Sequence, residues 1–222
     1  MIRERKNVVK KTKRSSKQKK TNKSFKGERR MYSAIRALLQ DHPTWKCAAR
    51  LYGRRTSDNF FFTVNHKYMT NGEVSCFANF RFSLGELALP WDLKATRGEH
   101  GIAITWTDVR ETAYSSGSDR LLVGLFHEQY PDRPVLIDTG ATRAHRLAPV
   151  RVDPKYGEGV HLYPFFERED KTAYSEDQYF NFGYTPEIIA AENEEKVSEN
   201  KRKFLKWVLR HSKVRKKLKG KS

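Results

Sequence analysis

The sequence predicts an α+β fold: N-terminal helices and a small sheet, then an antiparallel immunoglobulin-like β-sandwich, then a long basic C-terminal helix. Three observations predict it: apolar residues at helical spacing early in the chain, short apolar runs separated by turn residues in the second half, and a C-terminal stretch without Pro or Gly. The expected segments are a disordered basic arm (1–26), a helical or α+β segment (27–97), the sandwich (98–183) and the C-terminal helix with its basic tail (184–222).

The charge of the chain is concentrated at its two ends. The 222 residues include 44 Lys and Arg against 26 Asp and Glu, a formal net charge of +18. Residues 1–30 hold 14 basic and 2 acidic side chains, and residues 196–222 hold 12 and 1. Residues 31–195 hold 18 basic and 23 acidic side chains, so the body is slightly acidic. Such segregation points to a polyanionic partner.

Length and hydropathy limit the class of protein. The chain is long enough for one domain or two small ones. No apolar run approaches the roughly 20 residues that a transmembrane helix needs, and the N-terminus leads into lysines, not into the apolar core of a secretion signal. We therefore expect a cytoplasmic or virion protein that is not secreted through a classical signal peptide. Two cysteines allow at most one bridge.

The N-terminal arm is too polar to bury surface that would offset the entropy of ordering, so we expect it to be disordered when free. Lysines outnumber arginines in it, which favours contact with phosphates over reading of base edges. The candidate nucleic-acid-binding residues here are Lys10, Lys11, Lys13, Arg14, Lys17, Lys19, Lys20 and Lys23. A solubilising tail or a localisation signal is the alternative interpretation.

The segment after the arm shows mixed patterns. Helical spacing of apolar residues predicts a helix over 27–40 and a second, short helix over 45–52. Residues 60–68 fit a helix and a strand equally well. Asn71-Gly72 is a turn signal, and the alternation over 80–84 predicts a half-buried strand.

Six short apolar runs after Gly98 predict the strands of an antiparallel sandwich of immunoglobulin or fibronectin type III kind, with Trp106 as a core aromatic residue. These runs are 102–107, 120–127, 134–138, 146–152, 160–166 and 173–180.

A family resemblance rests on residues in this half. Residues 104–108, 119–123 and 160–166, together with Arg143, Ser175 and Tyr179, resemble the C-terminal half of an uncharacterised bacterial domain-of-unknown-function family. The helix from Arg29 to Leu39 and the segment up to Leu89 resemble its N-terminal half, so the likeness covers about residues 28–182. Members begin with a Gly-rich segment, where this chain has its cationic arm. The resemblance implies a fold and no activity.

The C-terminal segment reads as a helix that starts at Thr185-Pro186. An apolar stripe over 204–209 is flanked by lysines and would pack on the protein's own body or on a neighbouring subunit; membrane binding is the weaker interpretation. The candidate nucleic-acid-binding residues here are Lys201, Arg202, Lys203, Lys206, Arg210, Lys213, Arg215, Lys216, Lys217 and Lys219.

The sequence offers little for catalysis. Asp138-Thr139-Gly140 resembles the active-site loop of retroviral-type aspartic proteases, but such an enzyme needs a second aspartate from a second loop or from a dimer. A turn at a strand end, with Gly140 left-handed, explains the motif better. The histidines show no metal-ligand spacing. We expect no enzyme, no catalytic residues, no metal and no cofactor.

Two functions remain. The leading one is a non-enzymatic structural protein that binds nucleic acid without sequence preference through its basic ends, as a component of a phage virion or another nucleoprotein assembly with further protein subunits. The alternative is an immunoglobulin-like module that binds protein or glycan and carries solubilising tails. The choice between DNA and RNA, the oligomeric state and the identity of the assembly stay open.

Overall fold

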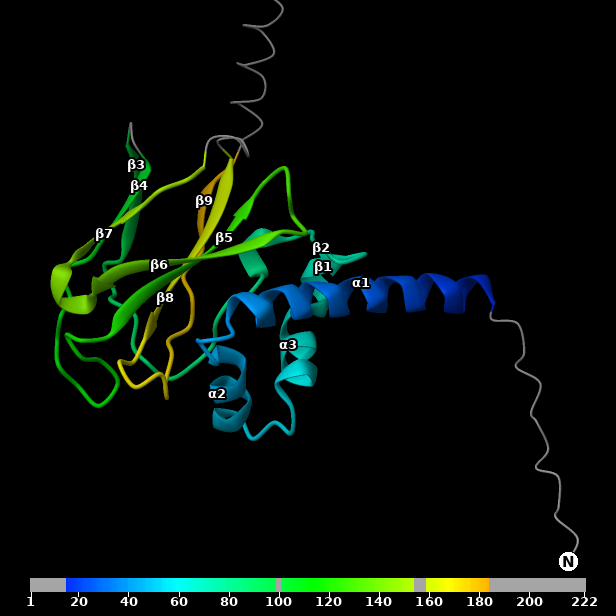
Figure 1. The fold of residues 1–222 in the computed structure, drawn as a ribbon, viewed down its shortest axis with the longest axis horizontal. Coiled ribbons are helices and arrows are strands. Elements are labelled where there is room, and N and C mark those ends of the chain that lie inside the picture. Colours follow the sequence, from blue (N-terminus) through cyan, green and yellow to red (C-terminus); the bar gives the residue numbers. More distant parts are fainter. Residues whose placement is uncertain (1–14, 99–100, 154–158, 184–222) are drawn as a thin grey trace, which may run out of the picture. The chain divides into compact units, whose positions relative to one another are not determined.

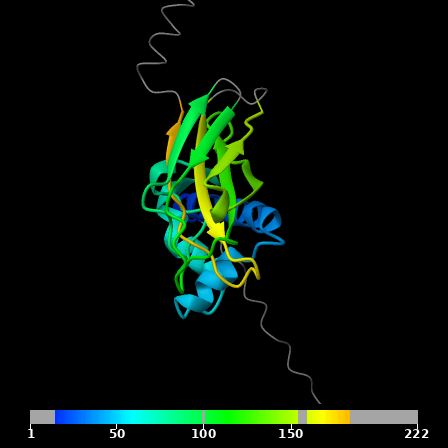
Figure 2. The same cartoon turned by 90° about the vertical axis from the view of Figure 1, so that its left-hand side faces the viewer.

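The computed structural model describes residues 15–98, 101–153 and 159–183, and only the backbone of residues 17–24. They form an α+β fold in three layers, as the sequence predicts at this level: helices, a four-stranded antiparallel sheet and a three-stranded antiparallel sheet (Figure 1). In Figure 2 the strands lie in front and the helices behind and below.

Three helices form the first layer: α1 (Ser16–Leu38), α2 (Thr44–Leu51) and α3 (Ser57–Asn65). The predicted helix over 27–40 overlaps the C-terminal part of α1, and the one over 45–52 coincides with α2 within one residue. The ambiguous segment after residue 57 is a helix, because Thr56 caps it by accepting a hydrogen bond from the backbone N–H of Asn59 (3.4 Å) and its aromatic residues are buried against the other helices.

The expected disordered arm is wrong for residues 16–26, since α1 begins at Ser16. Lysine and glutamine have high helix propensity, so a segment too polar to bury surface can still continue a helix that is anchored further along. The anchor is the buried face of Met31 and Ile35. Residues 1–14, and the predicted C-terminal helix in 184–222, lie outside the described residues.

A hairpin follows the helices. Strands β1 (Met69–Thr70) and β2 (Glu73–Val74) are joined by Asn71 and Gly72, both with positive φ (55° and 94°), as the turn signal predicts. The Asn71 carbonyl lies against Gly27 of α1, where a Cβ would be only 2.3 Å from the carbonyl oxygen. The hairpin therefore packs directly against α1.

The strand predicted over 80–84 is absent from the described structure. Phe80 and Phe82 are buried without a strand partner, and a 3-10 helix (Phe77–Asn79) precedes them. The Asn65 side chain makes the backbone hydrogen bonds that a neighbouring strand would otherwise make. Asn65 Oδ1 accepts from the Arg81 N–H (2.8 Å), and Asn65 Nδ2 donates to the Arg81 carbonyl (3.0 Å). The Asp177 carboxylate accepts from the N–H groups of Phe82 and Ser83.

Seven strands make the two sheets. The three-stranded sheet has the order β3-β4-β7, with β3 (Lys94–Gly98), β4 (Gly101–Thr105) and β7 (Leu147–Val150). The four-stranded sheet has the order β6-β5-β8-β9, with β5 (Arg120–His127), β6 (Pro134–Thr142), β8 (Val160–Glu167) and β9 (Phe180–Phe182). All neighbouring strands are antiparallel.

Five of the six predicted runs coincide with strands. The run 173–180 is the exception: it contributes only single bridges at Tyr174 and Ser175, and β9 begins at Phe180. Strand β3 was not predicted.

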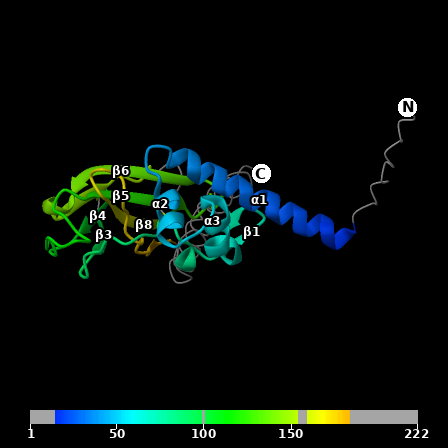
Figure 3. The ribbon, with the colours of Figure 1, turned by 90° about the horizontal axis from the view of Figure 1, so that it is seen from below.

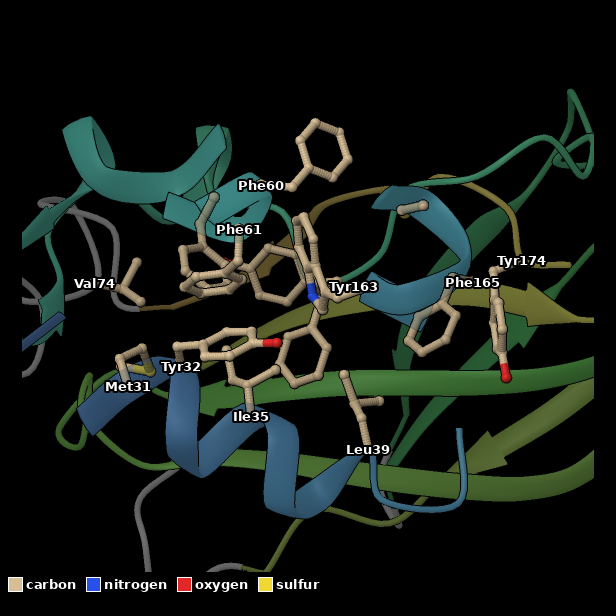
Figure 4. Close-up of a cluster of buried hydrophobic side chains, with 14 of the residues drawn as sticks. Met31, Tyr32, Ile35, Leu39, Phe60, Phe61, Val74, Tyr163, Phe165 and Tyr174 are labelled. Atoms are coloured by element: carbon tan, nitrogen blue, oxygen red, sulfur yellow. The ribbon is translucent and has the colours of Figure 1, made fainter. Parts of the chain in front are cut away.

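Strands β5 and β8 are buried on both faces. Leu121, Val123 and Leu125 of β5 face the three-stranded sheet and share a core with Ile102 and Ile104 of β4. The residues between them face the helices, where Leu122 and Phe126 join Tyr163 and Phe165 of β8 and the aromatic residues of α1 and α3 (Figure 4). The predicted segments 27–97 and 98–183 therefore share the core between the helices and the four-stranded sheet, and the described residues through Phe182 belong to one compact unit.

A buried ion pair closes one end of the sheet-to-sheet core. Arg143 Nε donates to Asp119 Oδ2 (3.4 Å), and the guanidinium lies 4.3 Å from the Phe166 ring centroid. Trp106 is buried, as predicted for a core aromatic residue, and its Nε1 donates to the Arg143 carbonyl (2.7 Å). Burial raises the pKa of Asp119 and lowers the pKa of Arg143. Several residues of the family resemblance therefore contact one another here.

The Asp138-Thr139-Gly140 motif is a bulge within β6 and not a turn at a strand end. The register of β6 against β5 shifts there, and Gly140 has the expected left-handed φ of 68°. Asp138 Oδ1 accepts from the Gly140 N–H (3.0 Å), while Oδ2 pairs with Arg120 (3.0 Å). This aspartate has a structural partner.

Close packing on Gly124 gives a first prediction. A Cβ at this residue of β5 would lie 2.4 Å from the Phe82 ring, so Gly124→Ala forces the ring or the strand to shift. We expect Gly124→Ala to lower the free energy of unfolding by about 1–3 kcal/mol in urea titrations. Gly98→Ala is the matched control, because the nearest atom to its Cβ is 3.9 Å away. Equal losses in the two variants would contradict this packing.

His161 lies in the core between the sheet and the helical layer. Its ring stacks on Phe77 (centroids 3.7 Å apart), its Nδ1 is 2.9 Å from the Tyr179 hydroxyl, and its Nε2 is buried without a partner among the described residues. Burial lowers the pKa of His161 to about 4. Since the pKa is near 6.5 in an unfolded chain, acid protonates the unfolded state first.

We expect this histidine to make the protein less stable as the pH falls from about 6.5 towards 4. The contribution reaches about 3 kcal/mol, at 1.36 kcal/mol for each unit of pKa difference. Urea unfolding of the native protein and of His161→Phe at several pH values measures it. The phenylalanine keeps the stack on Phe77 and cannot be protonated, so its stability should fall less in acid. Parallel pH profiles for the two proteins would refute the assignment.

Candidate nucleic-acid interface

The binding residues predicted from the sequence lie mostly outside the described structure. Lys10, Lys11, Lys13 and Arg14 belong to residues 1–14, and all ten of the C-terminal set belong to 184–222. Lys17, Lys19, Lys20 and Lys23 lie on α1, where only the backbone is described. The grouping of these residues into one binding site therefore stays a prediction.

The described part of the chain carries a different basic cluster, which the sequence analysis missed. Lys46 and Arg50 of α2, with Arg54 and Arg55 of the loop before α3, surround a surface hollow of about 540 Å³. Ala49, Thr56, Ser57 and Asp58 complete its lining. We call these four cations the α2–α3 basic cluster.

The local fold explains why the four cations converge. Helix α2 buries Trp45, Ala48 and Ala49, so Lys46 and Arg50, one turn apart, lie together on its exposed face. Gly53, with φ of 62°, ends the helix, and the Arg54 N–H donates to the Ala49 carbonyl (2.7 Å). The chain therefore turns back at once, and the two loop arginines follow directly after the helix.

The cluster is electrostatically uncompensated. Among the described residues, none of its four cations forms an ion pair. Arg54 instead lies over the Phe60 ring (5.8 Å), which orients the guanidinium without neutralising it. One acidic side chain, Asp58, lines the same hollow. The cluster can therefore attract a phosphate-bearing polymer.

Charge is also divided between the layers of the fold. Residues 25–68, which include the helical layer, hold nine basic and three acidic side chains, whereas residues 69–182 hold twelve and seventeen. Figure 3 shows α1, α2 and α3 gathered on one side, away from β3 and β4. The basic face of the described structure is thus the helical one.

A second hollow adjoins the first at Lys46, which lines both. It has a volume of about 460 Å³ and lies where α1 ends and α2 begins, with Arg36 and His42 among its lining residues. His42 Nδ1 is hydrogen-bonded to the buried Glu167 carboxylate of β8, which also accepts from the Tyr174 hydroxyl (3.1 Å). Burial and the Glu167 charge raise the pKa of Tyr174.

No group of three or more His, Cys, Asp or Glu side chains in residues 15–98, 101–153 and 159–183 is placed to hold a metal ion. In the same part of the chain, no helix combines the length and apolar character that crossing a bilayer requires.

The family resemblance stays a prediction. Comparison of the chain with protein-family models, with curated proteins and with solved structures found no match.

Proposed function

We propose that this protein is a non-enzymatic, sequence-independent nucleic-acid-binding component of a nucleoprotein assembly, such as a phage virion. One observation in the described structure carries the proposal: the unpaired cations of the α2–α3 basic cluster surround one hollow on the basic helical face. The sequence of the two ends supports it, because 26 of the 44 basic residues lie in residues 1–30 and 196–222.

The physics of phosphate binding fits these features. Each cation that neutralises a phosphate releases condensed counterions. For duplex DNA, each such contact makes the slope of the logarithm of the binding constant against the logarithm of the salt concentration more negative by about 0.9. With six to ten such contacts, affinity falls about 10³- to 10⁵-fold between 50 and 200 mM salt. No aromatic side chain lines the hollow at the α2–α3 basic cluster, so we expect contact with the backbone and little sequence preference.

The sandwich takes the role of a scaffold in this proposal, and we classify it as immunoglobulin-like. Strands β3, β4 and β7 correspond to A, B and E, and β6, β5, β8 and β9 to C′, C, F and G. This order supports the classification, because immunoglobulin domains also place C, F and G side by side in one sheet and A, B and E in the other. In an assembly, such a body would hold the cationic ends and contact neighbouring subunits.

A second candidate function has one observation in its favour. Trp91 is 79% exposed and Tyr114 is 54% exposed, and the two segments are linked by a hydrogen bond from the Ala88 N–H to the Tyr114 carbonyl (2.8 Å). Exposed aromatic rings in loops are common where proteins bind other proteins or glycans. A module of this kind would bind its partner through these rings, with the basic ends serving solubility.

Salt-dependent binding tests the leading proposal. We expect labelled DNA and RNA, duplex and single-stranded and all with 5′-hydroxyl ends, to bind tightly at 50 mM salt. Replacing Arg50, Arg54 and Arg55 with Gln should reduce the magnitude of the salt slope on duplex DNA by about 2–3, because each phosphate contact contributes about 0.9. Replacing the candidate lysines and arginines of the two ends with Gln should reduce it further.

The matched control replaces Arg110 and Arg120 with Gln. These cations are exposed, but each already pairs with an aspartate, Asp108 or Asp138, so their loss should leave the slope nearly unchanged. The proposal would be rejected if the control and the cluster variants changed the salt slope equally, or if binding did not depend on the salt concentration. The double variant Trp91→Ala/Tyr114→Ala tests the second candidate function. That function requires this variant to lose binding to the protein or glycan partner, while the variants with basic residues replaced by Gln still bind it.

A further inference from the structure

The first turns of α1 extend past the rest of the folded unit. Two perpendicular views show the N-terminal end of this helix running beyond β1, β2 and α3 (Figures 1 and 3). The first packing contacts described for the helix are those of Phe25, whose ring centroid lies 5.7 Å from that of Phe62 in α3, and of Gly27 against the turn between β1 and β2. Residues 16–24 contain no apolar residue. Burial in the core therefore does not explain the composition of these turns.

Four cations follow one face of α1, at steps of four, three and four residues: Lys19, Lys23, Lys26 and Arg30. This spacing forms one row along a helix with 3.6 residues per turn. The row lies outside the buried stripe of Met31 and Ile35, and its two described side chains, Lys26 and Arg30, are exposed. We call these four cations the α1 basic row.

The charge of the α1 basic row is not balanced by neighbouring acidic residues in the sequence. Residues 5–27 contain no Asp or Glu. Cations four residues apart on one face of a helix repel each other, and the N-terminal end of a helix already carries partial positive charge. Both effects oppose the helical state of these turns, and a row of phosphates beside them would reverse both. The helix therefore gains stability from a polyanion.

The shape of the extending helix distinguishes between polyanions. An α-helix with its side chains is about 10–12 Å wide, and the major groove of B-form DNA is about 12 Å wide, so the groove admits the helix. The major groove of A-form RNA is deep and too narrow for side chains to enter. A membrane surface fits less well, because a helix that lies on lipid buries an apolar face and residues 16–24 have none.

We propose that the N-terminal half of α1 binds in the major groove of B-form duplex DNA, with the α1 basic row against the phosphates that line the groove. This inference rests on the proposed function and names its nucleic acid, because it selects duplex DNA over duplex RNA. Residues 16–26 rise roughly 16 Å, at about 1.5 Å per residue, which is enough for three turns of helix in the groove. Lysine contacts phosphates and does not fork onto base edges, so binding stays independent of sequence.

Two duplexes of the same sequence, one of DNA and one of RNA, test the choice of polymer. Both are labelled and carry 5′-hydroxyl ends, and their binding to the full-length protein is measured by fluorescence anisotropy at about 150 mM salt. We expect the DNA duplex to bind about tenfold more tightly, because only its major groove admits the helix. Equal affinities, or tighter binding of the RNA duplex, would overturn the inference.

Two double variants with the same change in charge separate the α1 basic row from net charge. Lys19→Gln/Lys23→Gln removes two cations of the row. Lys17→Gln/Lys20→Gln, the matched control, removes two cations of the same segment that fall on another side of the helix. We expect the row variant to reduce the magnitude of the salt slope on duplex DNA by about 1.8, at about 0.9 for each phosphate contact, and the control to reduce it less than half as much. Equal reductions would contradict the assigned face.

A helix-breaking variant tests whether the helical form of the segment is needed. Ser24 precedes the packed part of α1, so Ser24→Pro breaks the turns before it and keeps every lysine. We expect this variant to keep salt-dependent binding and to lose the preference for duplex DNA. Ser24→Ala, the control, should keep both. An unchanged DNA preference in Ser24→Pro would refute binding through the helix.

These outcomes distinguish the inference from the proposed function. Equal affinity for the two duplexes, together with a reduced salt slope in the Arg50, Arg54 and Arg55 variant, rejects groove binding and keeps the proposed function. Binding that does not depend on the salt concentration rejects the proposed function itself. If Lys19→Gln/Lys23→Gln lost binding to phosphatidylserine vesicles and kept its binding to DNA, the row would belong to a membrane surface and the inference would fall.

Discussion

The rest of the fold depends on the burial of both faces of strands β5 and β8. Every residue of β8 is buried, and so is every residue of β5 except the first, so neither strand has a face that water could cover. The three-stranded sheet covers one face, and the helices together with Phe80 and Phe82 cover the other. This constraint fixes the helical layer to the sandwich, and with it the position of every basic residue on α2 and the loop that follows.

The sequence predicted those elements in which burial determines which residues are apolar. The continuous apolar runs of β5 and β8 were located within one residue, and the buried stripe of α1 marked its C-terminal half. Strand β3 was missed because its residues are mostly exposed and carry no apolar alternation. The alternation at Phe80 and Phe82 looked like a strand because both rings are buried, but Asn65 and Asp177 satisfy the backbone there.

The basic cluster was harder to predict, because a charge count over a long segment combines residues that lie on different faces of the folded protein. The body has more acidic than basic residues, and this balance hid the excess of cations in the helical layer. The sequence did contain a signal for this cluster. Lys46 and Arg50 lie four residues apart, which places them on the same exposed face of α2, and two arginines follow the Gly that ends the helix. The Glu167 partner of His42 comes from a segment 125 residues further along the chain, which no local pattern reveals.

The separation of charge between the layers has a consequence for how this molecule meets other molecules. A cationic helical layer joined rigidly to an acidic sandwich gives the folded unit a permanent electric dipole moment. In the field of the polyanion that we propose as partner, such a moment would turn the helices towards the polymer before contact, so fewer collisions would arrive in the wrong orientation. The negative charge of the sheets would be repelled by the same polymer, which would leave the acidic sheets on the outer side.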